Sequence, residues 1–276
     1  MGLFALQQEL PVKCGPAVVS ERPRSKVLGK PGGRIGDFCD YALNAYVGCG
    51  FGCSYCYAAF FVADETLRQA WGSWVDVKTA ALEEIELCPN LKGKRVTMST
   101  ATDPYQPLEA RIGLTRQLVE AMSHPLRQPK LVIQTRSPLV VRDIDLFKRF
   151  EHLRVNMSIT TDCDEIRKEF EPGCSSIERR MDAIRELRDA GIKTGVTVSP
   201  MLPVKDPHVF GKTLAELGAD RYAVCDFHQT DRPFAASTRD RARALLRQHH
   251  WTRNEYERAA YIIRGYLARD DAFGEF

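Results

Sequence analysis

Short apolar stretches alternate with longer amphipathic ones along most of this chain. Six stretches are short, rich in apolar or β-branched residues and bounded by turn residues, which is the pattern of strands in a buried sheet. We expect strands at residues 42–47, 95–99, 131–135, 154–159, 193–199 and 221–226. Because helical patterns separate them, the alternation predicts parallel strands with helices packed outside the sheet.

Apolar spacing predicts the helices between these strands. Leu114, Leu118 and Met122 recur at helical spacing and share one face. Another helix is expected to begin at the capping-box sequence 175–178, Ser-Ser-Ile-Glu, and to end at Ala190. Further helices are expected at 57–70, 77–87 and 213–217.

The composition divides the chain into three parts. Residues 1–40 are rich in Pro, Gly, Lys and Arg, with a turn signal at 31–33, and predict an irregular N-terminal arm. Residues 41–230 carry the alternation of strands and helices and form the predicted core. Residues 231–276 predict a helical, Arg-rich C-terminal extension, in which Thr252 caps the final helix.

Composition and charge are those of an ordinary soluble globular protein, with 44% hydrophobic and 27% charged residues. No apolar run approaches the ~20 residues of a transmembrane helix, and the first residues lack a basic leader. We therefore expect a cytoplasmic protein with no membrane partner. The net charge of +3 is too small to indicate a nucleic-acid partner. The basic stretch 239–253 could contact phosphate, although a solvated helix face is the simpler explanation.

Three of the nine cysteines, Cys49, Cys53 and Cys56, have the spacing C-x3-C-x2-C. Three thiolates on one tight loop can hold three corners of an iron–sulfur cube and leave the fourth iron open. Glycines alternate with them and let the backbone adopt positive φ. The other six cysteines are scattered, which fits a reducing compartment better than a disulfide framework. A zinc site completed by Cys39 or a distant His is the alternative, and three buried structural thiols are another.

The triplet, with Tyr55 before its last cysteine, resembles the cysteine motif of the radical SAM superfamily. Within that superfamily, residues 40–230 resemble the family of spore photoproduct lyase, often labelled DNA repair photolyase-like. The resemblance implies an open, partial (β/α)6 barrel, whereas periodicity alone leaves a flavodoxin-like sheet as the alternative. The supporting segments are 43–49, 100–109, 135–137, 142–146, 157–161, 171–173, 179–180 and 199–203.

Polar residues follow the predicted strands at their carboxyl ends, where the active residues of α/β folds gather. Because the cysteine loop follows the first strand, these side chains could line one pocket with it. Taken singly, each of these residues is explained more simply as a helix cap or a turn residue. The strand-end residues are Thr100, Thr102, Asp103, Gln134, Arg136, Ser158, Thr160, Ser199, Asp226 and His228.

The resemblance also implies cofactors and roles. It implies a [4Fe–4S] cluster on the three cysteines, S-adenosylmethionine (SAM) at the open iron, and a one-electron reductant of the flavodoxin or ferredoxin type. One electron would cleave SAM to methionine and a 5′-deoxyadenosyl radical, which would abstract hydrogen from the substrate. By resemblance, the cofactor-binding residues are Tyr55 and Tyr57 at the adenine, Thr102 at the methionine part, Arg136 at the carboxylate, Ser158 at the ribose, and Ser199.

One position departs from the family pattern. Spore photoproduct lyase has a cysteine at the end of the second strand that returns a hydrogen atom to the product radical, and Thr100 stands at the matching place. An O–H bond is too strong to give hydrogen readily to a carbon radical, so clean repair of the thymine lesion is not expected. The thiols that could substitute are Cys163, Cys174 and Cys225.

Thr100 and Asp103 are the candidates for catalytic contact with the substrate. Asp103 is expected to bind the substrate or the Arg136 side chain, or else to be a turn residue before Pro104. His228 is a candidate acid or base, although a lone histidine is more often structural.

The sequence thus predicts a radical SAM enzyme with a substrate open among a nucleic-acid lesion, a peptide and a small metabolite. Two other hypotheses stand beside it. One is a zinc-binding module that binds nucleic acid, and the other is an iron–sulfur redox or regulatory protein without SAM chemistry.

Overall fold

The computed structural model describes residues 9–32, 35–88, 90–228 and 237–267. Its main sheet has seven strands in the order β11-β10-β9-β8-β7-β4-β3. The short β3 (Leu28–Gly29) pairs antiparallel with β4 at one edge. The other strands are parallel and lie in chain order: β4 (Tyr41–Leu43), β7 (Arg95–Met98), β8 (Lys130–Thr135), β9 (Leu153–Ser158), β10 (Lys193–Val198) and β11 (Arg221–Val224).

This sequential order confirms the predicted partial (β/α)6 barrel. A flavodoxin-like sheet would place its first two strands out of sequence, so that alternative is excluded. Among the described strands, β11 and β3 form open edges, so the barrel is not closed. The last five predicted strands agree with β7 to β11 to within two residues at each end.

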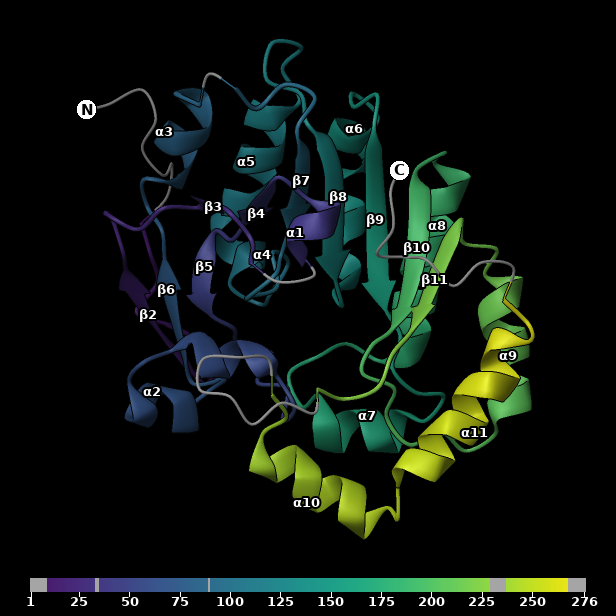
Figure 1. Cartoon of the computed structure of the whole chain (residues 1–276). Helices are drawn as coiled ribbons and strands as arrows, with labels where there is room; N and C mark the ends of the chain where they lie inside the picture. The colour runs from purple at the N-terminus through teal and green to yellow at the C-terminus, as the bar shows by residue number, and fades with distance from the viewer. Residues whose placement is uncertain (1–8, 33–34, 89, 229–236, 268–276) are drawn as a thin grey trace.

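Helices cover the outer face of the main sheet and bury its apolar side chains. On β8, Leu131 and Ile133 lie in the core between sheet and helices, whereas Gln134 points to the inner face. In Figure 1, α7 (Asp164–Phe170) and α10 (Asp240–Gln248) lie beyond the carboxyl ends of the strands. The helices of the outer layer are α5 (Leu114–Met122), α6 (Ile144–Phe147), α8 (Ile177–Asp189) and α9 (Pro207–Glu216), with the 3-10 helix η2 (Pro138–Asp143). The last helix, α11 (Arg253–Arg264), packs against α9, and the short α4 (Glu109–Ile112) precedes α5.

A second, small sheet was not predicted. It has the order β1-β2-β6-β5, with bounds β1 (Lys13–Cys14), β2 (Ala17–Glu21), β6 (Trp74–Val77) and β5 (Tyr46–Gly48). The arm expected to be irregular is therefore partly regular, with β1, β2, β3 and α1 (Ile35–Phe38). The prediction failed because β2 pairs with β6, far away in the sequence, and such pairing leaves little local signal.

Two predicted elements are split. The expected strand 42–47 is β4 and β5, which belong to different sheets, so the cysteine loop follows β5 and not the first barrel strand. The expected helix 57–70 is η1 (Tyr57–Phe61) and α2 (Glu65–Gln69), because Asp64 accepts hydrogen bonds from two backbone N–H groups and caps a new helix.

Other helices begin or end a few residues away from the predicted positions. The expected helix 77–87 is the end of β6 followed by α3 (Ala81–Glu86). The N-cap of α8 is Ser176, one residue after the position predicted by the capping box, since its hydroxyl accepts from Arg179 N. Thr252 caps α11 as predicted. In the described ranges, each helix is too short or too polar to cross a membrane.

Candidate functional site

The cysteine loop, residues 49–56, leaves β5 and enters η1. Cys49 and Cys53 are buried, and Cys56 is half-buried. Gly48 begins the loop with a φ of +79°, and a Cβ there would lie 2.6 Å from the carbonyl oxygen of Trp74. Only glycine fits this close approach. Backbone hydrogen bonds close one turn after Cys49 and another after Cys53.

The loop is held on one side by the segment that follows β7. The Thr102 hydroxyl donates to the carbonyl of Gly48 at 2.6 Å. Gln106, which is fully buried, accepts from the N–H of Gly50 at 2.8 Å and donates to the Thr102 hydroxyl at 3.2 Å. The Thr102 hydroxyl, which was predicted to contact the methionine part of SAM, is thus already hydrogen-bonded to the start of the loop.

The loop is held on the other side by residues 170–174, Phe-Glu-Pro-Gly-Cys, which we call the clamp segment. The N–H of Ser54 donates to the carbonyl of Phe170 at 2.8 Å, and the N–H of Gly173 donates to the carbonyl of Phe51 at 3.1 Å. A Cβ on Gly173 would lie 2.7 Å from that same carbonyl oxygen. The two backbones therefore approach as closely as glycine allows.

Two side chains contact the thiol of Cys53. Arg136 Nη1 lies 3.3 Å from the sulfur. The sulfur of Cys174 lies 3.8 Å from it. The guanidinium of Arg136 also stacks on the ring of Tyr55, with 5.8 Å between its central carbon and the ring centroid. The residue predicted to bind the SAM carboxylate thus lies directly against the cysteine loop.

The three thiols differ in their electrostatic surroundings. The hydrogen bond with Cys174, helped by the charge of Arg136, lowers the pKa of Cys53. Burial raises the pKa of Cys56 to about 11 and raises that of Cys49 further. Cys53 is thus the thiol for which neighbouring groups outweigh the effect of burial.

Asp103 is buried and all its hydrogen bonds are internal. One carboxylate oxygen accepts from Tyr105 N at 2.9 Å and from the Thr135 hydroxyl at 2.7 Å. The other accepts from the backbone N–H of Arg136 at 2.9 Å. Asp103 thus fixes the main chain of Arg136 and not its guanidinium, which supports a positioning role.

Thr100 follows the end of β7 and is hydrogen-bonded to Asn44, which follows β4. Asn44 donates to its hydroxyl and accepts from its N–H, both at 3.0 Å. The Tyr57 hydroxyl donates to its carbonyl at 2.5 Å. The ring of Tyr57 also stands nearly perpendicular to that of His228, with centroids 4.9 Å apart. Thr100, Tyr57 and His228 therefore share one side of the site.

Ser158 lies in a cluster of polar groups on the inner face of the sheet. Gln134 Nε2 donates to its hydroxyl at 3.0 Å and to that of Thr197 at 2.8 Å. Three buried polar atoms around the site have no hydrogen-bond partner among the described residues: Ser54 Oγ, Gln134 Oε1 and Arg136 Nε. Unpaired buried groups are costly, so these atoms fit a site that a polar ligand completes.

Glu171 is a site residue to which the sequence analysis gave no role. Its carboxylate accepts from the hydroxyls of Tyr55 at 2.5 Å and Thr160 at 2.9 Å, and it pairs with Arg180 at 2.5 Å. Burial by itself raises its pKa, but Arg180 and Arg136 hold the pKa of this carboxyl below its usual value. The segments that contain Glu171 and Arg180 belonged to the family resemblance, which was the available signal.

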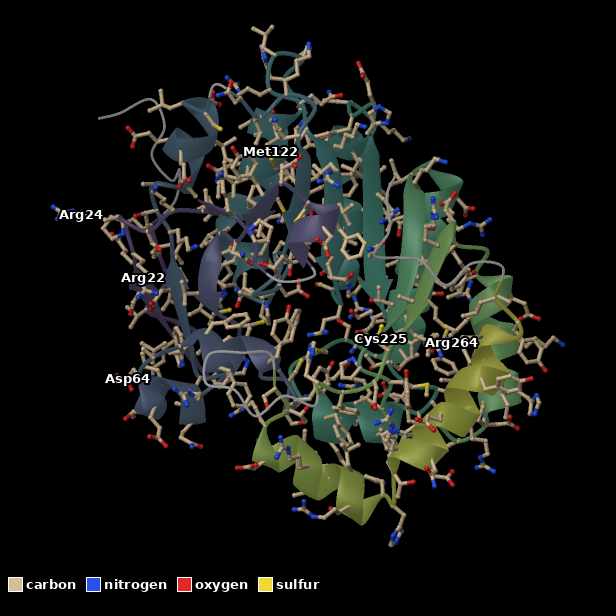
Figure 2. All side chains as sticks on the ribbon, viewed as in Figure 1. Arg22, Arg24, Asp64, Met122, Cys225 and Arg264 are labelled. Atoms are coloured by element: carbon tan, nitrogen blue, oxygen red, sulfur yellow. The ribbon has the colours of Figure 1, made fainter. Side chains whose placement is uncertain are left out.

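The remaining candidates lie at or near the strand ends. Ser199 follows β10 directly and is half-buried. Cys225 lies at the lower, carboxyl end of β11 (Figure 2). Cys163 precedes α7 directly, and its thiol donates to Glu165 at 3.1 Å. Asp226 accepts from the N–H of its neighbour Phe227.

The arrangement gives no support to a closed zinc site. In the part of the chain that the structure describes, no three His, Cys, Asp or Glu side chains converge on a point that could hold one metal ion. Structural zinc needs four such ligands around a single ion. Ligands of an iron–sulfur cube bind different irons, so they need not converge on one point.

The sequence comparisons agree with this geometry. The family model of the radical SAM superfamily matches residues 43–217. An uncharacterised protein of Methanocaldococcus jannaschii is 36% identical over 175 residues, which cover 63% of this chain and 65% of that protein. The chain thus spans slightly less than two thirds of this relative.

Solved structures with the same fold are more distant in sequence. Spore photoproduct lyase complexed with dinucleoside spore photoproduct matches 93% of this chain and 81% of its own, with a TM-score of 0.62 and 16% identity. SuiB of Streptococcus suis bound to S-adenosylmethionine matches 83% of this chain and 48% of its own, with a TM-score of 0.53 and 15% identity.

The chain belongs to the radical SAM superfamily. Its fold is that of spore photoproduct lyase.

Proposed function

We propose that the protein is a radical SAM enzyme that holds a [4Fe–4S] cluster on Cys49, Cys53 and Cys56 and binds SAM between that cluster and the strand ends. One electron from a flavodoxin- or ferredoxin-type donor would cleave SAM, and the resulting 5′-deoxyadenosyl radical would take hydrogen from the substrate. One observation carries the proposal. The glycine-lined cysteine loop faces Arg136, and buried polar atoms beside it lack partners.

The chain's own residues would bind and orient the cofactors. Arg136 has an unpaired Nε and a planar guanidinium, which suits a bidentate carboxylate. Tyr55 and Tyr57 are fixed through their hydroxyls, so their rings are held in place for the adenine. Ser158 is assigned to the ribose, and Ser199 to the cofactor site without a specific part of SAM. Burial of the loop by the clamp segment would keep water from the reacting atoms.

The substrate chemistry follows from Thr100. No thiol occupies the end of β7, so a substrate radical next to Thr100 would meet no weak S–H bond there. We infer that the reaction is not the repair of the thymine lesion, although a nucleic acid stays among the candidate substrates with peptides and small metabolites. The cytoplasmic location is likewise a proposal.

The experiment is anaerobic reconstitution followed by metal, sulfide and product analysis. We expect about four irons and four sulfides per chain, and methionine plus 5′-deoxyadenosine on addition of SAM and dithionite. Stoichiometric zinc would favour the nucleic-acid module. A full cluster that never cleaves SAM would favour the redox or regulatory protein.

A further inference from the structure

The three cysteines of the loop are unequally surrounded. The sulfur of Cys53 has two side-chain neighbours with polar hydrogens, Arg136 at 3.3 Å and Cys174 at 3.8 Å. The thiols of Cys49 and Cys56 are instead approached by backbone N–H groups, those of Phe51 and Ala58. Cys53 is thus the predicted ligand that the fold places against other polar side chains. Its neighbour Cys174 has no role in the function proposed above.

The position of Cys174 is fixed by the clamp segment. Its side chain is buried, with 7% of its surface exposed. Its carbonyl accepts from Arg167 Nη1 at 2.9 Å, and its N–H donates to the carbonyl of Glu171 at 3.1 Å. The adjoining Gly173 is bonded to the cysteine loop itself at Phe51. The two sulfurs therefore belong to backbones that are held against each other.

Protonation determines which of the two sulfurs donates the hydrogen bond. Either thiol could donate when both carry protons. A cysteine that ligates iron has lost its proton. Once Cys53 is a ligand, only the S–H of Cys174 can donate, and the Cys53 sulfur becomes its acceptor.

We propose that Cys174 is a positioning residue that donates its S–H to the ligand sulfur of Cys53 and raises the reduction potential of the cluster. This inference rests on the cluster assignment of the proposed function. Hydrogen bonds to cluster sulfurs set the reduction potential, because they stabilise the added negative charge of the reduced state. Cys174 would thus make the electron transfer that starts SAM cleavage easier.

The test is the midpoint potential of the reconstituted, SAM-free enzyme, followed by the EPR signal of the reduced cluster. Cys174→Ala removes the donor, Cys174→Val removes it but fills the volume, and Cys174→Ser keeps a hydroxyl donor. Cys14→Ala is the matched control, since Cys14 is also 7% exposed but lies in β1 of the small sheet. Iron and sulfide content is measured first for every variant.

We expect the Ala and Val variants to disfavour reduction at least threefold, which is about 28 mV in the negative direction for a one-electron couple. The Ser variant and the control should stay near the wild-type potential. Wild-type potentials in both donor-less variants would overturn the proposal, as would an equal shift in the Ser variant, which would indicate packing. Absence of a cluster from the wild type would instead refute the proposed function.

Discussion

A single guanidinium, that of Arg136, connects the cysteine loop to the strand ends. Its Nη1 contacts Cys53, its plane stacks on Tyr55, and its Nε has no partner among the residues that the structure describes. Asp103 accepts a hydrogen bond from the backbone N–H of Arg136 and so fixes its main chain. At the scale of residues, Arg136 is therefore the position at which SAM binding can be tested most directly.

Arg136→Ala should weaken SAM binding, because the SAM carboxylate would lose a charged partner in a buried place. The loss of one member of such a pair costs roughly 2–5 kcal/mol. Arg136→Lys keeps the charge without the planar fork and should lose less. Equilibrium binding of SAM to cluster-loaded protein measures the effect. An unchanged affinity in the Ala variant would remove Arg136 from the SAM site.

The second prediction at this scale concerns Thr100. The wild type should form 5′-deoxyadenosine on reduction but should not convert dinucleoside spore photoproduct cleanly to thymines, for want of a nearby S–H. Thr100→Cys would place a thiol there at little steric cost, and Thr100→Ser is its control. Anaerobic assays with the dinucleoside lesion and dithionite compare the three. Clean repair by the wild type would contradict the inferred divergence and point to another cysteine as donor.

At the scale of elements, the clamp segment and the loop after β7 are hydrogen-bonded to the cysteine loop from two sides. Gly173 is the tightest point, since a Cβ there would lie 2.7 Å from the Phe51 carbonyl oxygen. The main-chain hydrogen bond between these residues needs that approach. The cysteine loop is therefore shaped by neighbours that are more than 40 residues distant in the sequence.

Gly173→Ala should lower the cluster content of reconstituted protein several-fold, because the clamp segment must move away from the loop. Gly29→Ala is the control, since a Cβ on Gly29 would meet no atom within 4 Å. Iron content and circular dichroism of both variants separate a local defect from unfolding. A full cluster in the Gly173 variant would show that the loop holds its shape without the clamp.

The elements also show what the sequence could and could not predict. The alternation of strands and helices was enough for parallel strands with helices outside, but their sequential order came from the family resemblance. The spacing of Cys49, Cys53 and Cys56 favoured an iron–sulfur cluster and left zinc as the alternative. The small sheet was missed because β2 and β6 pair only in the folded chain. Gln106 and Glu171 were missed because a buried polar side chain has no pattern of its own. Its role depends on partners that only the tertiary structure brings close.

At the scale of the whole molecule, a buried ion pair joins three parts of the barrel. Glu171 and Arg180 are fully buried, and they tie α8 to the end of β9 and to the cysteine loop through Tyr55. Removing one partner of such a pair leaves an uncompensated buried charge. The pair thus links the stability of the fold to the shape of the site.

Glu171→Gln should lower the free energy of unfolding by about 3–5 kcal/mol. The pKa of Glu171 is lowered in the folded state, so its contribution is fully present above the unfolded value of ~4.3. It should be lost as the pH falls from there through the folded pKa, and the difference between wild type and variant should shrink in that window. Denaturant titrations at neutral and acidic pH measure both effects. Equal stabilities at neutral pH would contradict the role of the pair.

The measurement that tests the central claim most directly is the amount of 5′-deoxyadenosine formed from SAM under anaerobic reduction. The wild type and Cys14→Ala should form it, and alanine variants of Cys49, Cys53 or Cys56 should form none and hold no normal cluster. The product is quantified by chromatography against the iron content of each protein. Undiminished 5′-deoxyadenosine from a triple alanine variant, or none from a fully loaded wild type, would contradict the assignment of this loop as the SAM-cleaving site.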